Sequence, residues 1–296
     1  MKNIAISDSD IKKYIEKVVN NFGPDESEYD KFSNMIEMLI DNIDDHTEIH
    51  SFIDKCEFLR TVDSIMGHSR LKPCGYSGDY LLIERIYKNS ISYNVKYEKW
   101  DRYSLNTPAA QAVRNRKEYF CEVIKNNINK SNKNIKLLNV ASGPGRDLYD
   151  LYSSIDPQKL STTCLDADIN AVEYSKIVNK NFNNYISYVS CNALRFRPKV
   201  KYDIIWSAGL FDYFDDKTFI LALSLFREWL DVDGSIIIGN FSPSNPSKKY
   251  MEKFGDWYLH HRNEDELLDL AIKSGFNAEN CYIKSESLGI NLFLHC

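Results

Sequence analysis

The fold is decided by residues 135–149, which read IKLLNVASGPGRDLY. An apolar run over residues 135–141 passes directly into a loop that contains Gly143 and Gly145. Glycines after a buried strand let the backbone turn tightly and approach a ligand closely, and a helix that follows has free N–H groups at its first turn. The segment therefore predicts a strand, a tight loop and a helix. Because a tight turn needs no ligand, the loop alone does not establish a binding site.

From residue 131 onward, short β-branched runs alternate with helical patterns, which is typical of a parallel α/β sheet. The expected strands cover residues 135–141, 162–165, 185–190, 202–208, 234–241, 280–284 and 290–295, with helices over 170–181, 217–230 and 264–274. The last two strands are joined only by residues 285–289, which is too short for a crossover helix, so they should be antiparallel. We expect an α/β fold with a mostly parallel seven-stranded sheet and an antiparallel terminal strand.

The first part of the chain has a different pattern. Before residue 131 the segments have the character of helices joined by short polar breaks; residues 28–43 have apolar side chains at helical spacing, and Thr107-Pro108 opens a strong helix. Residues 126–134, NNINKSNKN, are polar and unpatterned. We therefore predict two domains, a helical N-terminal cap and substrate region over 1–130 and the sheet domain over 131–296.

Composition excludes several classes of protein. The 296 residues carry a formal charge of −5, with 43% hydrophobic and 27% charged residues, so the chain is globular and lacks the basic excess of a nucleic-acid or anionic-lipid binder. No apolar run approaches the ~20 residues that cross a bilayer, and the first residues are too polar for a signal peptide. We expect a cytoplasmic location without stable membrane insertion. The 7 scattered Cys are expected to be reduced core thiols.

An acid follows the glycine loop at the distance typical of nucleotide sites. Asp166 ends the second expected strand, 21 residues after Gly145. An acid about 20 residues beyond the glycines can accept hydrogen bonds from both ribose hydroxyls. Asp168 competes for this role, although it is better placed as the N-cap of the next helix. The loop and Asp166 together predict an adenosine-type ligand in a Rossmann-like crevice.

The loop lacks the last glycine of a dinucleotide fingerprint. Leu148 stands at the sixth position counted from Gly143, and Asp147 stands just before it. The Asp147 carboxylate would repel a pyrophosphate but tolerates a ligand that bears an ammonium and a sulfonium. These features favour S-adenosylmethionine (SAM) over NAD as the cofactor.

On these residues the segment 135–296 resembles a class I SAM-dependent methyltransferase. In that family the first strand and its loop hold the methionine and sugar, and the end of the third strand contacts the adenine. Asn192, in Cys191-Asn192-Ala193-Leu194, stands where an acid is commoner, but its amide oxygen can accept from the adenine amino group. The cofactor-binding residues that the resemblance implies are Ala141, Ser142, Gly143, Gly145, Asp166, Ala167, Asn192, Ala193, Ser207 and Ala208.

Four further segments are similar to a bacterial subgroup of that family, the extracellular-factor 3-hydroxypalmitic acid methyl ester biosynthesis proteins. They are KPCGYSGDY (72–80), TPAAQAVRNR (107–116), SAGLFDYF (207–214) and NFSPSNPSKKYMEKFGDWYLHHR (240–262). This similarity covers most of the chain beyond residue 70. It implies a small-molecule acceptor and, for the subgroup, methyl ester formation on a 3-hydroxy fatty acid.

Two arginines of the helix after Pro108 are candidates for binding an anion. At ~100° per residue Arg116 falls on the apolar face, where an unpaired charge costs several kcal/mol. It is predicted either to clamp a carboxylate of the acceptor or cofactor, or to form an internal ion pair with Asp79 or Asp147. Arg114 points away from that face and is kept as a substrate candidate in case the N-terminal region covers it.

Polar and aromatic residues elsewhere could contact the acceptor. In the loop 73–80, a predicted wall or lid, Tyr76 is a catalytic candidate and Asp79 a substrate candidate, with a purely structural loop as the alternative. After the fourth strand Tyr213 could orient or deprotonate an acceptor, or simply pack. The remaining substrate candidates are Asn240, Trp257 and Arg262. One of His260 and His261 could act as a base, although a structural role is the commoner one.

We expect no metal site. Asp212, Asp215 and Asp216 together suggest magnesium, but Asp215 or Asp216 serves as the cap of the next helix and no further ligands are evident.

The sequence as a whole predicts a methyltransferase that acts on a carboxylate or hydroxyl of a small molecule. The alternatives are N-methylation of a small amine, methylation of nucleic acid or protein, and a binding protein that transfers no methyl. An N/D-P-P-Y motif, common in enzymes that methylate exocyclic amines, is replaced here by SAGL at 207–210. We expect no nucleic-acid partner and leave a homodimer open.

Overall fold

The computed structural model describes residues 8–42, 53 and 55–296. The chain forms two compact units. Unit 1 comprises Met1–Gln111 and Pro246–Tyr258, and unit 2 comprises Ala112–Asn245 and Leu259–Cys296. This division differs from the predicted boundary at residue 130, which is the last residue of helix α7 (Pro108–Lys130). The polar stretch 126–134 is the end of that helix and the turn into the sheet, so it marks a surface turn rather than a division between cores.

Unit 1 is helical. Its helices in the described residues are α1 (Asp8–Asn20), α2 (Tyr29–Asn42), α4 (Ile65–Leu71), α5 (Tyr80–Tyr87), α6 (Val95–Asn106) and α11 (Lys248–Lys253), with 3-10 turns at Glu26–Glu28 and Glu57–Arg60. The predicted helix 28–43 is α2; residue 43 lies outside the described residues. Phe32, Ile36 and Leu39 are buried at helical spacing on α2, which explains the apolar pattern in the sequence.

Residues 246–258 belong to unit 1 because their polar groups are bound there. The Tyr250 and Ser104 hydroxyls lie 3.0 Å apart, and the Ser69 hydroxyl donates to the Gly255 carbonyl. Tyr250 also packs edge-on against Tyr103. The chain order alone could not show this, because the segment follows a strand of unit 2 in the sequence.

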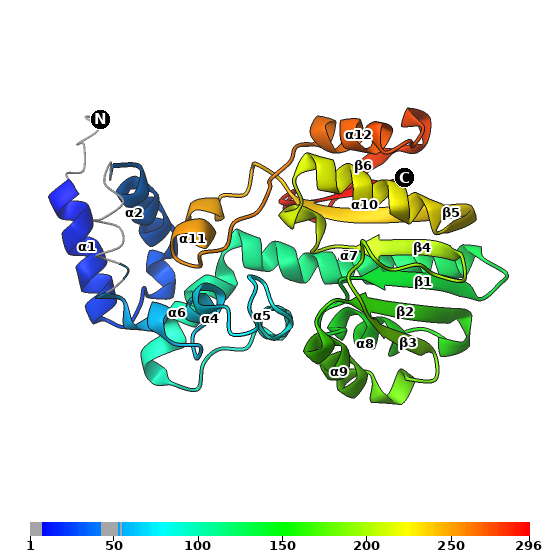
Figure 1. Ribbon diagram of the computed structural model, residues 1–296. Helices are drawn as coiled ribbons and strands as arrows, with labels where there is room; N and C mark the ends of the chain where they lie inside the picture. Colours follow the sequence, from blue (N-terminus) through cyan, green and yellow to red (C-terminus); the bar gives the residue numbers. More distant parts are fainter. Residues whose placement is uncertain (1–7, 43–52, 54) are drawn as a thin grey trace. The chain divides into compact units, whose positions relative to one another are not determined.

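Unit 2 is built on one seven-stranded sheet (Figure 1). Its strands are β1 (Ile135–Val140), β2 (Leu160–Asp166), β3 (Ile186–Ser190), β4 (Tyr202–Ser207), β5 (Leu230–Phe241), β6 (Tyr282–Ser285) and β7 (Asn291–His295). The order is β3-β2-β1-β4-β5-β7-β6. The pairs among β1 to β5 are parallel, and β7 is antiparallel to both β5 and β6. The predicted α/β fold with an antiparallel terminal strand is confirmed.

Two hydrophobic cores lie between this sheet and the helices, one on each face. The helices of unit 2 besides α7 are α8 (Arg146–Tyr152), α9 (Ile169–Val178), α10 (Asp216–Glu228) and α12 (Glu264–Lys273), with 3-10 turns at Pro157–Lys159, Lys180–Phe182, Phe211–Tyr213 and Ala278–Asn280. Apolar side chains of α7 and α8 pack on one face, and those of α10 and α12 on the other. Because β1, β2 and β4 are parallel neighbours, their carboxyl ends lie along one edge, which is where ligands bind in such sheets.

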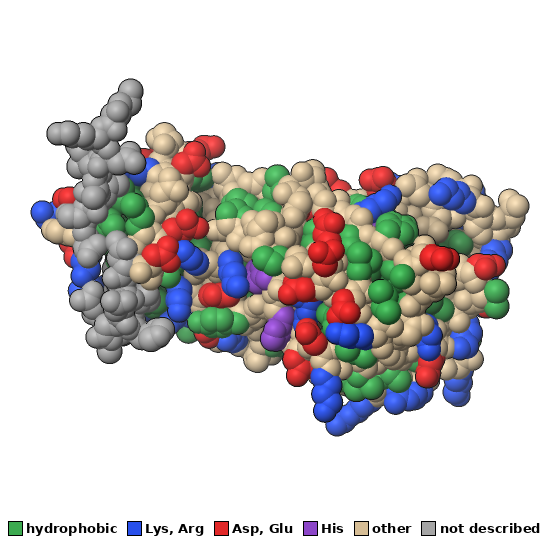
Figure 2. All heavy atoms as spheres, turned by 90° about the horizontal axis from the view of Figure 1, so that it is seen from above, with side chains coloured by type: hydrophobic (Ala, Val, Ile, Leu, Met, Phe, Trp, Pro, Cys, Tyr) green, Lys and Arg blue, Asp and Glu red, His purple; other side chains and the backbone are tan. Residues whose placement is uncertain are grey.

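The surface carries charges of both signs. On the face shown in Figure 2, acidic and basic side chains are interspersed among hydrophobic and other groups, with several Lys and Arg along the lower right edge. Among the described residues, none of the helices has both the length and the apolar composition required to cross a bilayer.

Candidate active site

The glycine loop after β1 has an unusual backbone. Ala141, Gly143 and Gly145 have φ values of 53°, 55° and 67°, in the left-handed region that glycine adopts without cost and alanine does not. The loop is held to β2, because Ser142 N donates to the Leu165 carbonyl at 3.3 Å. A strained alanine between a strand and a glycine loop is typical of a functional site.

Asp166 lies directly against this loop. Its Oδ2 accepts a hydrogen bond from Gly143 N at 2.8 Å, and its Oδ1 accepts one from Asp168 N at 2.9 Å. Burial raises the pKa of the Asp166 carboxyl, and the two backbone donors oppose that rise. Each carboxylate oxygen has a second lone pair, so the group can still accept two hydrogen bonds from a ligand. Asp168 is the N-cap of α9, as expected.

The other predicted cofactor residues lie near the same edge. Cys191 N, just after β3, donates to the Asp166 carbonyl. Asn192 is exposed, and its amide oxygen accepts from Leu194 N, so this oxygen also stabilises its own turn. Ala167 is exposed and Ala193 packs against the core. Ser207, at the end of β4, is fully buried, and its hydroxyl has no hydrogen-bond partner among the described residues.

Alanine substitutions at the two glycines are expected to separate ligand binding from folding. A Cβ at Gly143 meets nothing within 4 Å, whereas one at Gly145 would lie 2.1 Å from Ser175 Oγ and 2.7 Å from Asn179 Nδ2. Gly143→Ala should lower the free energy of unfolding by about 1–2 kcal/mol, the cost of its φ, and Gly145→Ala by roughly twice that or more. The Gly143→Ala methyl group, projecting into open space, should weaken binding of the adenosine-type ligand expected at this loop. Urea unfolding and calorimetry measure both effects; equal destabilisation by the two variants would contradict this packing.

Arg116 is buried at the end of β4. Its side chain is 7% exposed and its Nη1 donates to the Ala208 carbonyl at 3.0 Å. It interacts electrostatically with the carboxylates of Asp147 and Asp212. The sequence suggested Asp147 as a partner and missed Asp212. Asp79, the other suggested partner, belongs to unit 1.

Asp147 and Asp212 are both buried acids. Burial raises the pKa of Asp147 to about 6 and that of Asp212 to about 7, while the Arg116 guanidinium opposes both shifts. Asp212 Oδ1 accepts from Phe241 N at 2.6 Å, so the residue also joins the loop after β4 to the end of β5. Two acids that titrate near neutral pH beside a candidate ligand site are candidates for proton transfer.

Arg262 is also buried, and all of its N–H groups are engaged. Nε and Nη2 donate to Asp216, Nη1 to Asn240 Oδ1 and the Phe211 carbonyl, and Nη2 also to the Phe214 carbonyl. Its guanidinium lies 4.9 Å from the centre of the Phe219 ring. The two predicted substrate residues Arg262 and Asn240 therefore bind each other and hold the loop after β4. A ligand could bind Arg262 only by displacing one of these bonds.

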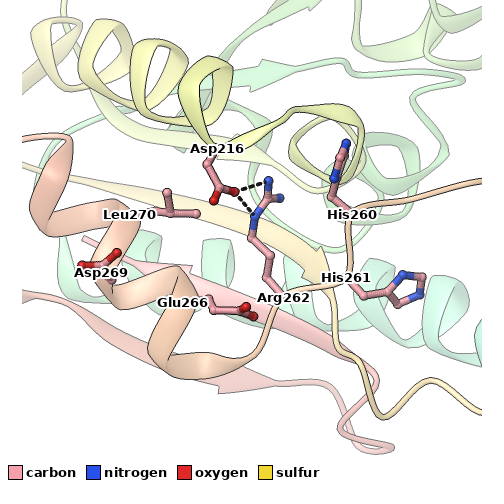
Figure 3. Close-up of a pocket in the computed structure, with 7 residues that line it drawn as sticks. All are labelled: Asp216, His260, His261, Arg262, Glu266, Asp269 and Leu270. Atoms are coloured by element: carbon pink, nitrogen blue, oxygen red, sulfur yellow. Dashed lines mark hydrogen bonds and ion pairs between the residues drawn. The ribbon is translucent and has the colours of Figure 1, made fainter.

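A cavity of about 160 Å³ lies beside Arg262 (Figure 3). It is lined by Asp216, His260, His261, Arg262, Glu266, Asp269 and Leu270. Its acids already have structural roles, because Glu266 caps α12 and Asp269 pairs with Lys273. Among the described residues no group of three His, Cys, Asp or Glu is placed to hold a metal ion.

The remaining unit 2 candidates are Tyr213, which is exposed, and Arg114, which is partly buried. Tyr213 lies in the 3-10 turn after β4 and is 39% exposed. Arg114 Nη1 is buried without a hydrogen-bond partner among the described residues, and burial lowers the pKa of this arginine.

In unit 1, the side chain of Asp79 holds the end of the loop 73–80, which was predicted as a wall or lid. Asp79 is buried, caps α5 and lies 2.9–3.0 Å from His68 Nε2 through both carboxylate oxygens. Burial opposes its ionisation, but the hydrogen bonds from His68 and from the Leu82 backbone lower its pKa overall. Tyr76 is 39% exposed in the same loop, and Trp257 N donates to the Met251 carbonyl. His68, which lies on α4, was not among the residues predicted from the sequence.

Comparison with known proteins gives the fold. No protein-family model and no curated protein matches the chain. Several solved structures are similar to it. A possible exported protein from Bordetella parapertussis has 14% identity and a TM-score of 0.61, over 73% of this chain and 78% of that one. A proposed O-methyltransferase from Nostoc punctiforme PCC 73102 has 11% identity and a TM-score of 0.54, over 81% and 70%. Magnesium protoporphyrin IX methyltransferase from Synechocystis PCC 6803, solved with bound SAH, has 14% identity and a TM-score of 0.50, over 73% and 98%. The sheet thus has the Rossmann-like fold found in methyltransferases.

Proposed function

We propose that the chain is a SAM-dependent methyltransferase that acts on the oxygen of a small molecule, a carboxylate or a hydroxyl. One acceptor that fits the subgroup resemblance is a 3-hydroxy fatty acid. The observation that carries the proposal is the Asp166 carboxylate, bound to Gly143 N beside a loop whose next acid, Asp147, disfavours a pyrophosphate. The likeness in fold to methyltransferase structures supports it.

The residues at the sheet edge suit the parts of SAM. Asp166, with Ala167 beside it, accepts from the ribose hydroxyls, and Asn192 and Ala193 border the adenine. The space over Gly143 fits a ligand that lies against the loop from Ala141 to Gly145. The buried Ser207 hydroxyl supplies an unused donor beside Ala208.

When bound, SAM supplies a methyl group on a sulfonium, which is already a good leaving group. The protein then has to hold the acceptor in line with that methyl and exclude water. Arg116 and Tyr213 are the unit 2 groups that we propose for orienting the acceptor. Arg114 is the proposed substrate contact of unit 2. Asn240 and Arg262 bind each other, and we propose that they hold the loop after β4 rather than contact the substrate.

Binding and transfer can be tested in turn. Isothermal titration should show SAM and S-adenosylhomocysteine binding with a Kd on the order of 1 μM, and no heat with NAD. Label from [methyl-³H]SAM should then pass from the purified chain into the small-molecule fraction of a cell extract. NAD binding without SAM binding would overturn the proposal. Label in the protein or nucleic-acid fraction would change the acceptor class, and binding without transfer would leave only a binding protein.

A further inference from the structure

Arg116, Asp147 and Asp212 form a buried charge cluster at the end of β4 in unit 2. Arg116 donates to the Ala208 carbonyl, and its guanidinium nitrogens lie 3.5 Å from the position of a Cβ on Gly209. It therefore packs on the first residues after β4. Asp147, from the glycine loop side, and Asp212, from the turn after β4, both interact with it electrostatically. One guanidinium thus serves two buried carboxylates.

The charges of Arg116, Asp147 and Asp212 disfavour a charged acceptor group at this place. A second anion near Arg116 would add to the negative charge of Asp147 and Asp212, and bringing like charges together in a buried site is costly. Arg262 offers no alternative, because all of its N–H groups are engaged within the protein. A cationic acceptor beside Asp212 is also disfavoured, because the positive charges of Arg116 and Arg262 already interact with that carboxylate and would repel a third cation. A neutral group that donates a hydrogen bond avoids both costs.

Asp212 is placed to receive such a donor. Phe241 N donates a hydrogen bond to Asp212 Oδ1. Among the described residues no other residue donates a hydrogen bond to this carboxyl, so Oδ2 can accept one from a ligand. The turn that carries Asp212 directly follows Ser207 and Ala208, the segment proposed to line the cofactor. Asp212 therefore lies at the carboxyl edge of the sheet, where the end of β5 holds its Oδ1, while Asp147 lies in the first turn of α8, directly after the glycine loop.

We propose, on the premise of the methyl transfer proposed above, that the acceptor is a neutral alcohol or phenol and that Asp212 accepts its proton. The hydroxyl oxygen forms a bond to the methyl carbon while the carbon–sulfur bond breaks, and the electron pair of that bond stays on sulfur. The hydroxyl proton passes to Asp212 Oδ2. The positive charge of the sulfonium and the negative charge of the carboxylate disappear together, which leaves a methyl ether, a thioether and a protonated acid.

The pH dependence follows from the groups around Asp212. The charged groups that face it are Arg116 from α7 and Arg262 from the segment before α12, and His260 of that segment donates its backbone N–H to the Asp212 carbonyl. Burial outweighs the two arginines and raises the pKa of Asp212 to about 7. Only the ionised carboxylate accepts a proton, so the rate of transfer should rise as the pH increases through about 7 and then level off.

The chemical class of the product tests the proposal without knowledge of the acceptor. The purified chain is incubated with [methyl-¹³C]SAM and a metabolite extract, and the labelled product is examined by carbon-13 NMR before and after mild alkali. A methyl ether, with its own chemical shift and resistance to alkali, is expected. Label released as methanol indicates an ester, and an N-methyl shift indicates an amine; either would overturn the inference and leave the proposed methyl transfer intact. If no product is labelled, both fail.

Variants then test the role of Asp212. Asp212→Asn should lower kcat about 10²- to 10⁴-fold and abolish the rise in rate near pH 7, with SAM affinity kept within about twofold. Asp215→Asn, the same change at the exposed cap of α10, should leave kcat and the pH profile unchanged. An Asp212→Asn enzyme with normal kcat and pH profile would overturn the assignment. If this variant does not fold, the class of product and the pH profile of the unmodified protein still decide.

Discussion

Asp166→Ala is expected to weaken the binding of SAM and of S-adenosylhomocysteine at least ~100-fold, because two charge-assisted hydrogen bonds are worth roughly 3 kcal/mol or more. The carboxylate also accepts from Gly143 N, so its loss frees the loop that the ligand is proposed to contact. Isothermal titration measures the affinity, and circular dichroism verifies that the variant is folded. Asp166→Asn keeps the shape of the side chain and should lose most of the same affinity, because its NH2 group replaces one of the two acceptors.

The matched control is Asp168→Ala. Asp168 is the next acid along the chain and competes for the same role in the sequence. In the structure its side chain accepts from Asn170 N as the cap of α9. Its removal should cost about 1 kcal/mol of stability and little SAM affinity. If Asp168→Ala loses the affinity and Asp166→Ala retains it, the ribose belongs to Asp168 and the assignment made here fails.

The sheet could be predicted closely because its signals are local. Most strands of unit 2 contain a short apolar run, and the parallel strands other than β3 are followed by a helical pattern. The short link between β6 and β7 excluded a crossover helix, and the structure pairs these strands antiparallel. The position of Asp166 beside Gly143 also follows from local pattern, since neighbouring parallel strands bring their carboxyl ends together.

The buried charge cluster was only partly predictable. Helical periodicity placed Arg116 on an apolar face and suggested Asp147. Asp212, which lies 96 residues further along the chain, could be identified only from the packing of α7 against the end of β4. Arg262 was predicted as a substrate contact because its segment returns toward the sheet and an arginine can bind a carboxylate. The sequence could not show that Asp216, Asn240 and two backbone carbonyls occupy all of its donors.

Arg262→Met is expected to lower the free energy of unfolding by about 3 kcal/mol, a shift of roughly 1 M in the urea midpoint. The loss of stability arises from the hydrogen-bond acceptors that Arg262 leaves without a donor. Asn240 Oδ1 and the carbonyls of Phe211 and Phe214 lose a donor in a buried setting, whereas Asp216, whose side chain is 72% exposed, stays solvated. Urea unfolding followed by circular dichroism measures the change.

Arg227→Met is the control for removing an arginine from the same unit. Arg227 is exposed and donates to the Gly275 carbonyl, so its loss should cost no more than about 1 kcal/mol.

The stability and ligand affinity of Arg262→Met also distinguish a structural role for Arg262 from a role in binding the substrate. A structural role predicts that Arg262→Met loses stability while SAM affinity measured on the folded variant is retained. A substrate clamp predicts unchanged unfolding and a raised KM for the acceptor, because a ligand-binding arginine would have donors to spare. The complete engagement of its N–H groups favours the structural role, and it is the reason why we assign proton acceptance to Asp212 rather than anion binding to Arg262.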